Sequence, residues 1–141
     1  MKRLLQISTI VLLLTLSLSV SAFAYQYITA AEVKQHIAAR TPMTLVDIQV
    51  EDEFNQHHII GAQATYAYPV KTAADHAKMT PVITPLLTNN DMAVVVCPRG
   101  GGGAKRAYDL LLKSGVAEDR VYILKKGQAD WPYPELLDAS N

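Results

Sequence analysis

The sequence predicts an α/β fold in which a parallel sheet is covered by helices on both faces, and three observations lead to this prediction. Short apolar, β-branched runs alternate with amphipathic or capped segments of helical character. Strands that alternate with helices form parallel sheets, because each crossover returns the chain to the same end of the sheet. Half of the 141 residues are apolar, which is enough for a substantial core.

The first 24 residues are left out of the fold because they have the pattern of a secretory signal peptide. Lys2 and Arg3 form a basic start, residues 4–20 are mostly apolar, and Ala22-Phe23-Ala24 is a cleavage signal. We therefore expect cleavage after Ala24, one domain over residues 25–141, and a periplasmic or secreted location without stable membrane association. The alternative is an uncleaved membrane anchor.

The balance of charged residues excludes some classes of binding partner. Without Lys2 and Arg3, the mature chain has 11 basic and 13 acidic residues, so its formal charge is about −2. This balance predicts no nucleic-acid partner and no polybasic membrane tail.

The elements are expected in a regular order. A short strand at 27–28 precedes a helix that starts with a capping box, Thr29 to Glu32, and runs to about Ala39. Further strands are expected at 43–48, 62–66, 93–96 and 121–124. Further helical segments are expected at 51–56, at 72–88 as one or two short helices broken by Pro81 and Pro85, at 104–113 and at 135–139.

The most informative segment joins the strand at 93–96 to the helix at 104–113. Cys97 ends the strand and is followed by Pro98, Arg99 and the glycine run 100–103. We expect the glycine run to form an irregular loop whose backbone N–H groups turn inward, beside the positive end of a helix. A thiolate at Cys97 would face this anion cradle and act as a nucleophile on an anionic substrate.

Cys97 is the only cysteine of the chain, so it forms no internal disulfide. A buried, inert cysteine is the alternative to a functional one. The position at the carboxyl end of a strand, where ligands bind in parallel sheets, favours the functional interpretation.

Four segments follow one another in a recognisable order. They are Leu45-Val46-Asp47-Ile48 with Glu53-Phe54, the turn His58-Ile59-Ile60-Gly61-Ala62, the strand and loop at Cys97, and the stretch from Leu112 through Gly127 to Trp131. Together they resemble the single-domain rhodanese-like sulfurtransferases. The resemblance covers nearly all of residues 27–131. It implies a five-stranded parallel sheet with helices on both faces.

The resemblance also implies a reaction. Cys97 would take a sulfane sulfur from thiosulfate, a polysulfide or a persulfide, and the Cys97 persulfide would pass it to cyanide or a thiol, with a protein acceptor also open. No metal or organic cofactor is required. The donor would be bound by Arg99, Lys105, Arg106 and the glycines Gly100, Gly101, Gly102 and Gly103. The alternative is a non-enzymatic, periplasmic sulfur-carrier or binding module of the same fold.

Some positions depart from the family pattern. The glycine loop looks longer than usual and carries no side chains, Gln49 and His57 replace a common arginine and glycine, and Lys126 replaces one of two common glycines. These departures concern substrate choice more than fold.

Other chemistries match the residues less well. The glycine run superficially resembles a P-loop but lacks its spacing and its Ser or Thr. A cysteine phosphatase would need an arginine where Gly103 stands. His57 and His58 lack the spacing and partners of a metal site. We expect His58 to be a turn residue whose ring binds the backbone, and Asp47 to be structural, accepting backbone N–H groups near the loop rather than acting as a base.

Overall fold

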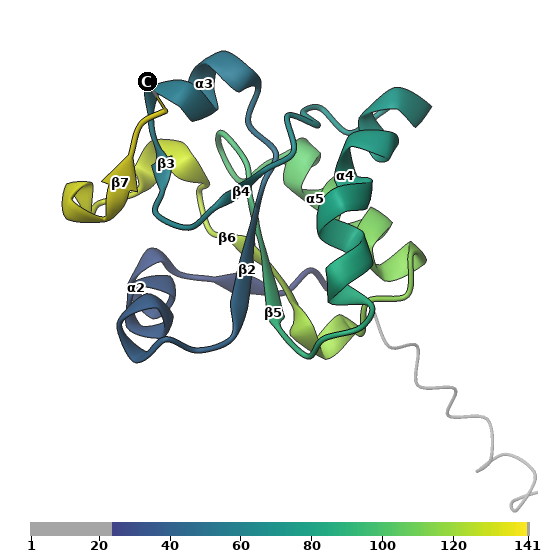
Figure 1. The fold of residues 1–141 in the computed structure, drawn as a ribbon, viewed down its shortest axis with the longest axis horizontal. Helices are drawn as coiled ribbons and strands as arrows, with labels where there is room; N and C mark the ends of the chain where they lie inside the picture. Colours follow the sequence, from purple (N-terminus) through teal and green to yellow (C-terminus); the bar gives the residue numbers. More distant parts are fainter. Residues whose placement is uncertain (1–23, 141) are drawn as a thin grey trace, which may run out of the picture.

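A five-stranded parallel sheet forms the centre of the protein in the computed structural model, which describes residues 24–140 (Figure 1). The strand order is β1-β6-β5-β2-β4, and every neighbouring pair is parallel. The strands are β1 (Tyr27–Ile28), β2 (Met43–Asp47), β4 (Gln63–Ala64), β5 (Met92–Val96) and β6 (Val121–Leu124). The predicted fold class is therefore confirmed. The expected signal peptide, except Ala24, lies outside the described residues.

Helices cover both faces of this sheet. Figure 1 shows α4 (Ala73–Leu86) and α5 (Gly102–Lys113) on one side, and α2 (Ala30–Ala39) on the other. The short helix α3 (Glu51–Gln56) lies at the end of the sheet where β2 and β5 finish. The predicted capping box is present, with Thr29 and Glu32 each accepting a hydrogen bond from the other's backbone N–H.

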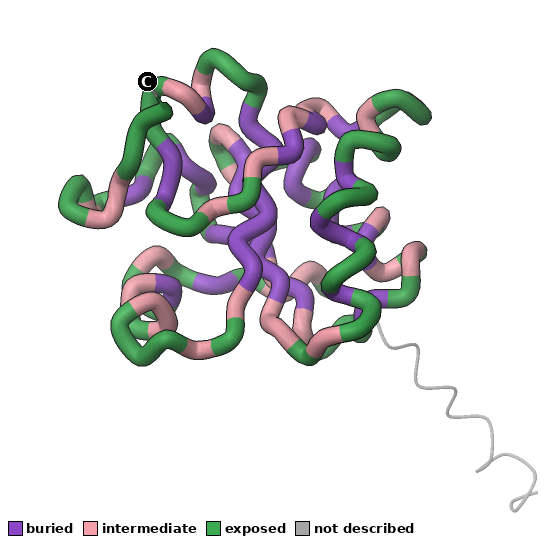
Figure 2. Tube along the Cα trace, viewed as in Figure 1, coloured by how far each residue is buried: buried purple, intermediate pink, exposed green. Residues whose placement is uncertain are grey.

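Two cores result from the alternation of side chains along the strands. In β5 and the residue after it, Ala93, Val95 and Cys97 pack towards α4 and α5, whereas Val94 and Val96 pack towards α2. Figure 2 shows the central strands as continuous buried segments. Cys97 therefore follows the strand's own alternation and directs its side chain towards the α4–α5 face.

Helix α4 corrects one expectation, because Pro81 and Pro85 do not break it. The segment forms a single helix of 14 residues, capped by Thr72 and Asp75. Each proline removes one helical hydrogen bond, but four residues of the helix are buried against the sheet: Met79, Val82, Ile83 and Leu86. This burial of large apolar side chains offsets the lost backbone bonds.

The C-terminal segment corrects a second expectation. Instead of a helix at 135–139, the chain makes one 3₁₀ turn at Pro134–Leu136 and then a short strand, β7 (Leu137–Asp138). β7 pairs antiparallel with β3 (His58–Ile59), a two-residue strand that the sequence analysis did not anticipate. The strand expected at 62–66 shortens to β4, because Tyr66 has a positive φ of 55° and leaves the extended conformation.

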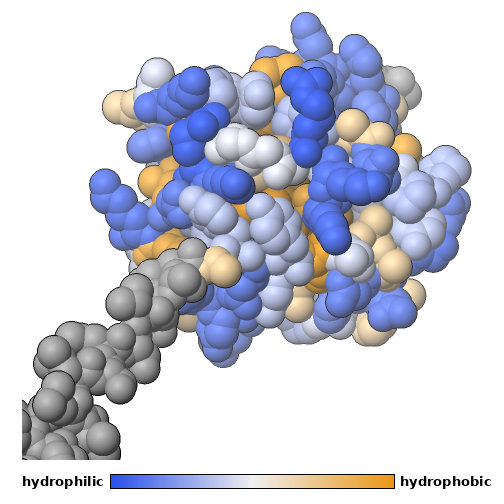
Figure 3. Space-filling view, turned by 180° about the vertical axis from the view of Figure 1, so that it is seen from behind, coloured by the Kyte–Doolittle hydropathy of each residue, from blue (hydrophilic) through white to orange (hydrophobic). Residues whose placement is uncertain are grey.

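The surface is mainly polar, and in the view of Figure 3 apolar areas are small and lie between hydrophilic ones. No helix among residues 24–140 is both long and apolar enough to cross a membrane.

Candidate active site

Cys97 lies directly after β5, at the carboxyl end of the sheet. Cys97 is only 2% exposed, and its side chain belongs to the core cluster on the α4–α5 face. The backbone N–H of Gly100 donates a hydrogen bond to the Cys97 Sγ, with a nitrogen–sulfur distance of 2.8 Å. The loop therefore turns a donor towards the sulfur, and this N–H would stabilise negative charge there.

The loop is shorter than the sequence suggested. It comprises Pro98 to Gly101, because α5 already begins at Gly102. Gly100 has a φ of +70°, as expected for a cradle of this kind, but Gly102 and Gly103 are helical. The expectation of an irregular run of four glycines is thus wrong for its second half.

Packing explains why glycines are used inside this helix. A β-carbon at Gly103 would lie 2.8 Å from a ring carbon of Tyr68, so the missing side chain leaves room for that ring. The N-cap, Gly101, has no side chain, so the first N–H groups of α5 receive no side-chain cap. They remain available to an anion at the start of the helix.

A second loop, after β6, fixes the position of Cys97. The backbone N–H of Gln128 donates to the Cys97 carbonyl oxygen over 2.8 Å, and that of Ala129 donates to the Pro98 oxygen over 3.0 Å. Gly127, with a φ of +68°, lies so close that a β-carbon there would overlap the Cys97 carbonyl oxygen. This role of Gly127 was not predicted from the sequence. The only local indication of it is a glycine that follows a strand and two lysines.

Asp47 is completely buried at the end of β2, where it is the register partner of Val96. It accepts the backbone N–H of Gln49 over 2.8 Å and the Gln49 side-chain amide over 3.1 Å. Burial raises the pKa of this carboxyl to about 6, against the lowering effect of the Gln49 hydrogen bonds. These contacts are of the structural kind that was expected for Asp47.

His58 also makes structural contacts. Its Nδ1 lies 2.8 Å from the Phe54 carbonyl oxygen, and its ring stacks on the Phe54 ring at a centroid distance of 3.8 Å. Within residues 24–140, no group of three or more His, Cys, Asp or Glu side chains could hold a metal ion.

The three expected donor-binding cations do not come together. Arg99 is exposed and lines a cleft beside the Cys97 loop. Lys105 instead lies over the ring of Tyr25, 5.3 Å from its centroid. Arg106 donates from Nε to the Pro69 carbonyl oxygen over 2.8 Å and lines a different cleft. Of the three, only Arg99 lines the cleft next to the loop, while the Arg106 guanidinium lies beside Gly102, where a β-carbon would be 3.0 Å from its Nη1.

That cleft has a volume of about 370 Å³ and carries charges of both signs. Its lining residues come from α3, from the Cys97 loop and from the loop after β6, and they are Gln49, Glu53, Gln56, His57, Pro98, Arg99, Gln128 and Ala129. Gln128 is 3% exposed, and both polar atoms of its side chain lack a hydrogen-bond partner. A polar ligand in the cleft could provide one.

The Rhodanese-like domain family matches residues 29–132, which include β2 through β6 and the Cys97 loop but not the two residues of β1. This chain belongs to that family. No curated protein matches the chain.

Solved structures show the same fold. The rhodanese-like domain described here is similar to an As-Sb reductase from Leishmania major, with 15% identity, coverage of 82% and 86% of the two chains, and a TM-score of 0.66. It is also similar to a rhodanese-like domain from Anabaena sp. (19% identity, coverage 82% and 80%, TM-score 0.62). A rhodanese-like domain protein from Staphylococcus aureus matches with 21% identity, coverage of 82% and 99%, and a TM-score of 0.60.

Proposed function

We propose that this rhodanese-like domain is a sulfurtransferase in which Cys97 carries the sulfur. The observation that carries the proposal is the hydrogen bond from the Gly100 N–H to the Cys97 Sγ, over 2.8 Å, at the carboxyl end of the parallel sheet. A backbone donor aimed at a sulfur stabilises a thiolate before reaction and a persulfide anion afterwards. Family membership supports the same reaction class.

The reaction has two displacement steps. The Cys97 thiolate attacks the outer, sulfane sulfur of thiosulfate; a new sulfur–sulfur bond forms, the bond within thiosulfate breaks, and sulfite leaves with the electron pair. Cyanide or a thiolate then attacks the outer sulfur of the Cys97 persulfide. The product is thiocyanate or a new persulfide, and the Cys97 thiolate is restored.

The protein's contribution is to hold negative charge. The Gly100 N–H reaches the sulfur, the uncapped first turn of α5 adds positive potential, and the exposed Arg99 can contact the oxygens of an anionic donor. None of these groups has to move a proton, because both nucleophiles react as anions.

One observation favours the alternative of a sulfur-carrier or binding module. Cys97 is 2% exposed, so little of this residue is accessible to a donor in the conformation described here. A carrier that exchanges sulfur once with a protein partner tolerates this restriction better than an enzyme with fast turnover. A carrier would differ from the enzyme in rate and not in the bond that forms, whereas a binding module would form no persulfide.

Intact-mass measurement of the purified mature chain tests the proposal. After incubation with thiosulfate, the protein should gain one sulfur atom and lose it when cyanide is added, with thiocyanate released in equal amount. Cys97→Ser is the matched control, and it should show no gain. Persulfide formation without repeated thiocyanate production would favour the carrier. No gain with any of thiosulfate, polysulfide or a low-molecular-weight persulfide would refute both the enzyme and the carrier and would leave the binding module.

We also propose that the protein works outside the cytoplasm. The basic start, apolar stretch and Ala22-Phe23-Ala24 signal support this location. Mature protein from the native host should begin at Tyr25, and a membrane-bound form that retains Met1 would show an anchor instead.

A further inference from the structure

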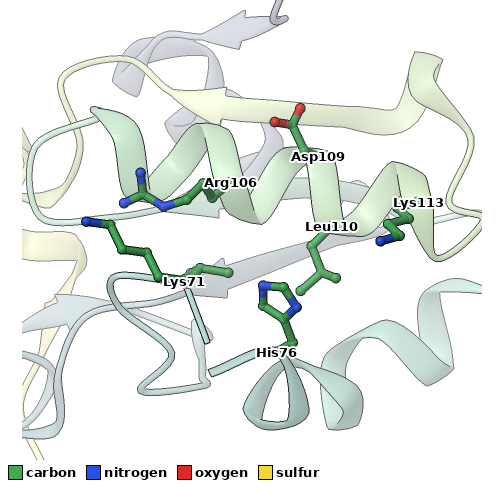
Figure 4. Close-up of a pocket in the computed structure, with 7 residues that line it drawn as sticks. Lys71, His76, Arg106, Asp109, Leu110 and Lys113 are labelled. Atoms are coloured by element: carbon green, nitrogen blue, oxygen red, sulfur yellow. The ribbon is translucent and has the colours of Figure 1, made fainter. Parts of the chain in front are cut away.

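A second cleft lies on the α5 face, away from the cleft beside Arg99. Its volume is about 320 Å³, and it is formed by α5, the start of α4 and the segment before α4 (Figure 4). The lining residues are Val70, Lys71, His76, Arg106, Asp109, Leu110 and Lys113. Four of the seven are basic, although the described chain as a whole is close to neutral.

Helix geometry arranges part of this lining as a stripe. Arg106, Leu110 and Lys113 are spaced by four and three residues, so they lie on one face of α5. A rise of about 1.5 Å per residue separates the backbone positions of Arg106 and Lys113 by roughly 10 Å along the helix. The stripe therefore has a cation at each end and an apolar side chain between them.

The basic side chains are not neutralised by the protein. Among residues 24–140 there are two salt bridges, Lys34–Glu135 and Lys126–Asp130, and neither involves the cleft. The one acidic lining residue, Asp109, accepts a hydrogen bond from the Tyr25 hydroxyl over 3.1 Å. Figure 4 shows its carboxylate on the side of α5 away from Lys71 and His76.

Arg106 and Lys71 make one end of the cleft especially cationic. Both line the cleft, and Figure 4 draws their charged tips at the same end of it. The Arg106 Nε is engaged by the Pro69 carbonyl oxygen, which anchors the guanidinium and leaves its two terminal nitrogens for another acceptor. Like charges held near each other repel, and an anion between them removes this repulsion.

We propose that this cleft binds a small organic dianion whose two carboxylates are separated by an apolar chain. One carboxylate would lie between Lys71 and Arg106, and the other would contact Lys113. The apolar chain would cover Leu110 and the buried Val70, with the His76 ring at the side. The cleft is within the size range of small-molecule sites.

Two features favour a two-ended ligand over a single inorganic oxyanion. An oxyanion between Lys71 and Arg106 would leave Lys113 and the apolar floor unused. The N-terminus of α4 also has its own cap, since the Asp75 N–H donates to the Thr72 hydroxyl over 3.1 Å and the Asp75 carboxylate lies at the same helix end, accepting the N–H groups of Lys71 and Thr72. The site therefore consists of side chains and is not a helix-end anion site.

Isothermal titration with three probes tests the proposal. Suberate has two carboxylates on a long apolar chain, octanoate has the same chain with one carboxylate, and succinate has two carboxylates on a short chain. Suberate should bind at one site, and each of the other probes should bind at least about tenfold more weakly, because each loses one charged contact or the apolar contact. Equal binding of suberate and octanoate, or no binding of suberate, would overturn the proposal.

Variants on the same helix locate the site. Arg106→Gln and Lys113→Gln should each weaken suberate binding about tenfold, by loss of a charged contact. Lys105→Gln makes the same charge change on α5 but outside the cleft, so it should leave the affinity unchanged. Lys113 is exposed and forms no salt bridge with another residue of 24–140, so its variant remains informative if Arg106→Gln fails to fold. An unchanged affinity of Lys113→Gln would refute the two-ended site.

The dianion site and sulfur transfer can fail independently. Cys97→Ser should bind suberate as the unmodified protein does, because Cys97 does not line this cleft. A protein that binds suberate without transferring sulfur would refute only the proposed function.

Discussion

The α-carbon of Gly127 lies against the carbonyl oxygen of Cys97, with no space between them for a β-carbon. The same β-carbon would lie 2.6 Å from the Gly100 nitrogen, which is the donor to the Cys97 sulfur. The loop after β6 and the loop after β5 therefore interlock through their backbones, and residue 127 controls the geometry around the sulfur.

Gly127→Ala should displace the Cys97 loop. The left-handed φ alone costs an alanine about 1–2 kcal/mol, and the overlap with the Cys97 carbonyl adds to this cost. We therefore expect the free energy of unfolding, measured by urea denaturation, to fall by more than the cost of the left-handed φ alone. We also expect a loss of sulfur transfer. An alanine variant with unchanged stability and rate would show that the two loops are not interlocked.

The glycines of the Cys97 loop should differ in how far replacement by alanine reduces activity. Gly100→Ala places a β-carbon 2.9 Å from the Lys126 backbone nitrogen at a φ of +70°, whereas a β-carbon at Gly101 meets nothing within 4 Å. Gly100→Ala should therefore reduce sulfur transfer strongly, and Gly101→Ala should be nearly silent. Steady-state rates and hydrogen exchange of the loop measure the difference, and equal effects of the two variants would contradict the structural distinction between them.

Arg99 should select the anionic donor. Arg99→Ala should raise the KM for thiosulfate by at least about fivefold through loss of a charged contact, with a smaller effect on kcat. Lys105→Ala is the matched control, since Lys105 lies over Tyr25. If both variants keep the KM of the unmodified protein, the backbone N–H groups alone bind the donor.

Asp47 should make stability fall as the pH rises from about 4 to above 6. Its pKa is about 6 in the fold against 3.8 for the ordinary carboxyl, so the folded state binds the proton more tightly than the unfolded state. The stabilisation is complete below pH 3.8 and is lost through pH 6; the full difference is on the order of 3 kcal/mol. Other carboxyls, such as Glu32 and Asp75, have lowered pKa values, so their contribution to stability is lost as the pH falls at the acidic end of the range.

Asp47→Asn isolates this contribution, because its amide oxygen can still accept the Gln49 N–H. Unfolding free energies of the variant and the unmodified protein, measured between pH 4 and pH 7, should diverge in favour of the variant as the pH rises. Parallel curves would mean that Asp47 titrates normally.

Lys126 occupies a left-handed conformation with a φ of 66°, which a glycine adopts without strain. Lys126→Gly should raise the free energy of unfolding by about 0.5–1 kcal/mol, because removal of the left-handed strain exceeds the entropy cost of glycine. The exposed Lys126–Asp130 salt bridge contributes little. Lys125→Gly, one residue earlier and without a positive φ, should instead destabilise the protein, and equal shifts of both variants would refute this account.

Much of the fold could be predicted from local sequence patterns. The β-branched runs of β5 and β6 and the capping box of α2 were predicted because sequence-local forces determine them. The two-residue strands β3 and β7 were not, since their pairing depends on contacts between segments almost 80 residues apart. The continuity of α4 through Pro81 was also unpredictable, because it depends on tertiary packing.

The candidate site was predicted only in part, because some of its features depend on local sequence and others on contacts between distant segments. The position of Cys97 at the end of a strand and a glycine loop that turns a backbone N–H inward follow from the local sequence, which does not single out Gly100 among the four glycines. The orientation of Lys105 and Arg106 could have been found: Ala104, Ala107, Tyr108 and Leu111 are the buried face of α5, so the two cations lie off that face. The contact of Gly127 with Cys97 joins two loops and has no local signal.

The pairing of β1 with β6 has a consequence for biosynthesis. Tyr27 and Ile28, next to the expected cleavage point, have Ile123 and Leu124 as their register partners. Within residues 24–140, β1 pairs with no strand other than β6, so it joins the sheet only after nearly the whole polypeptide has been made. If the chain is exported as proposed, the sheet would be completed only on the far side of the membrane.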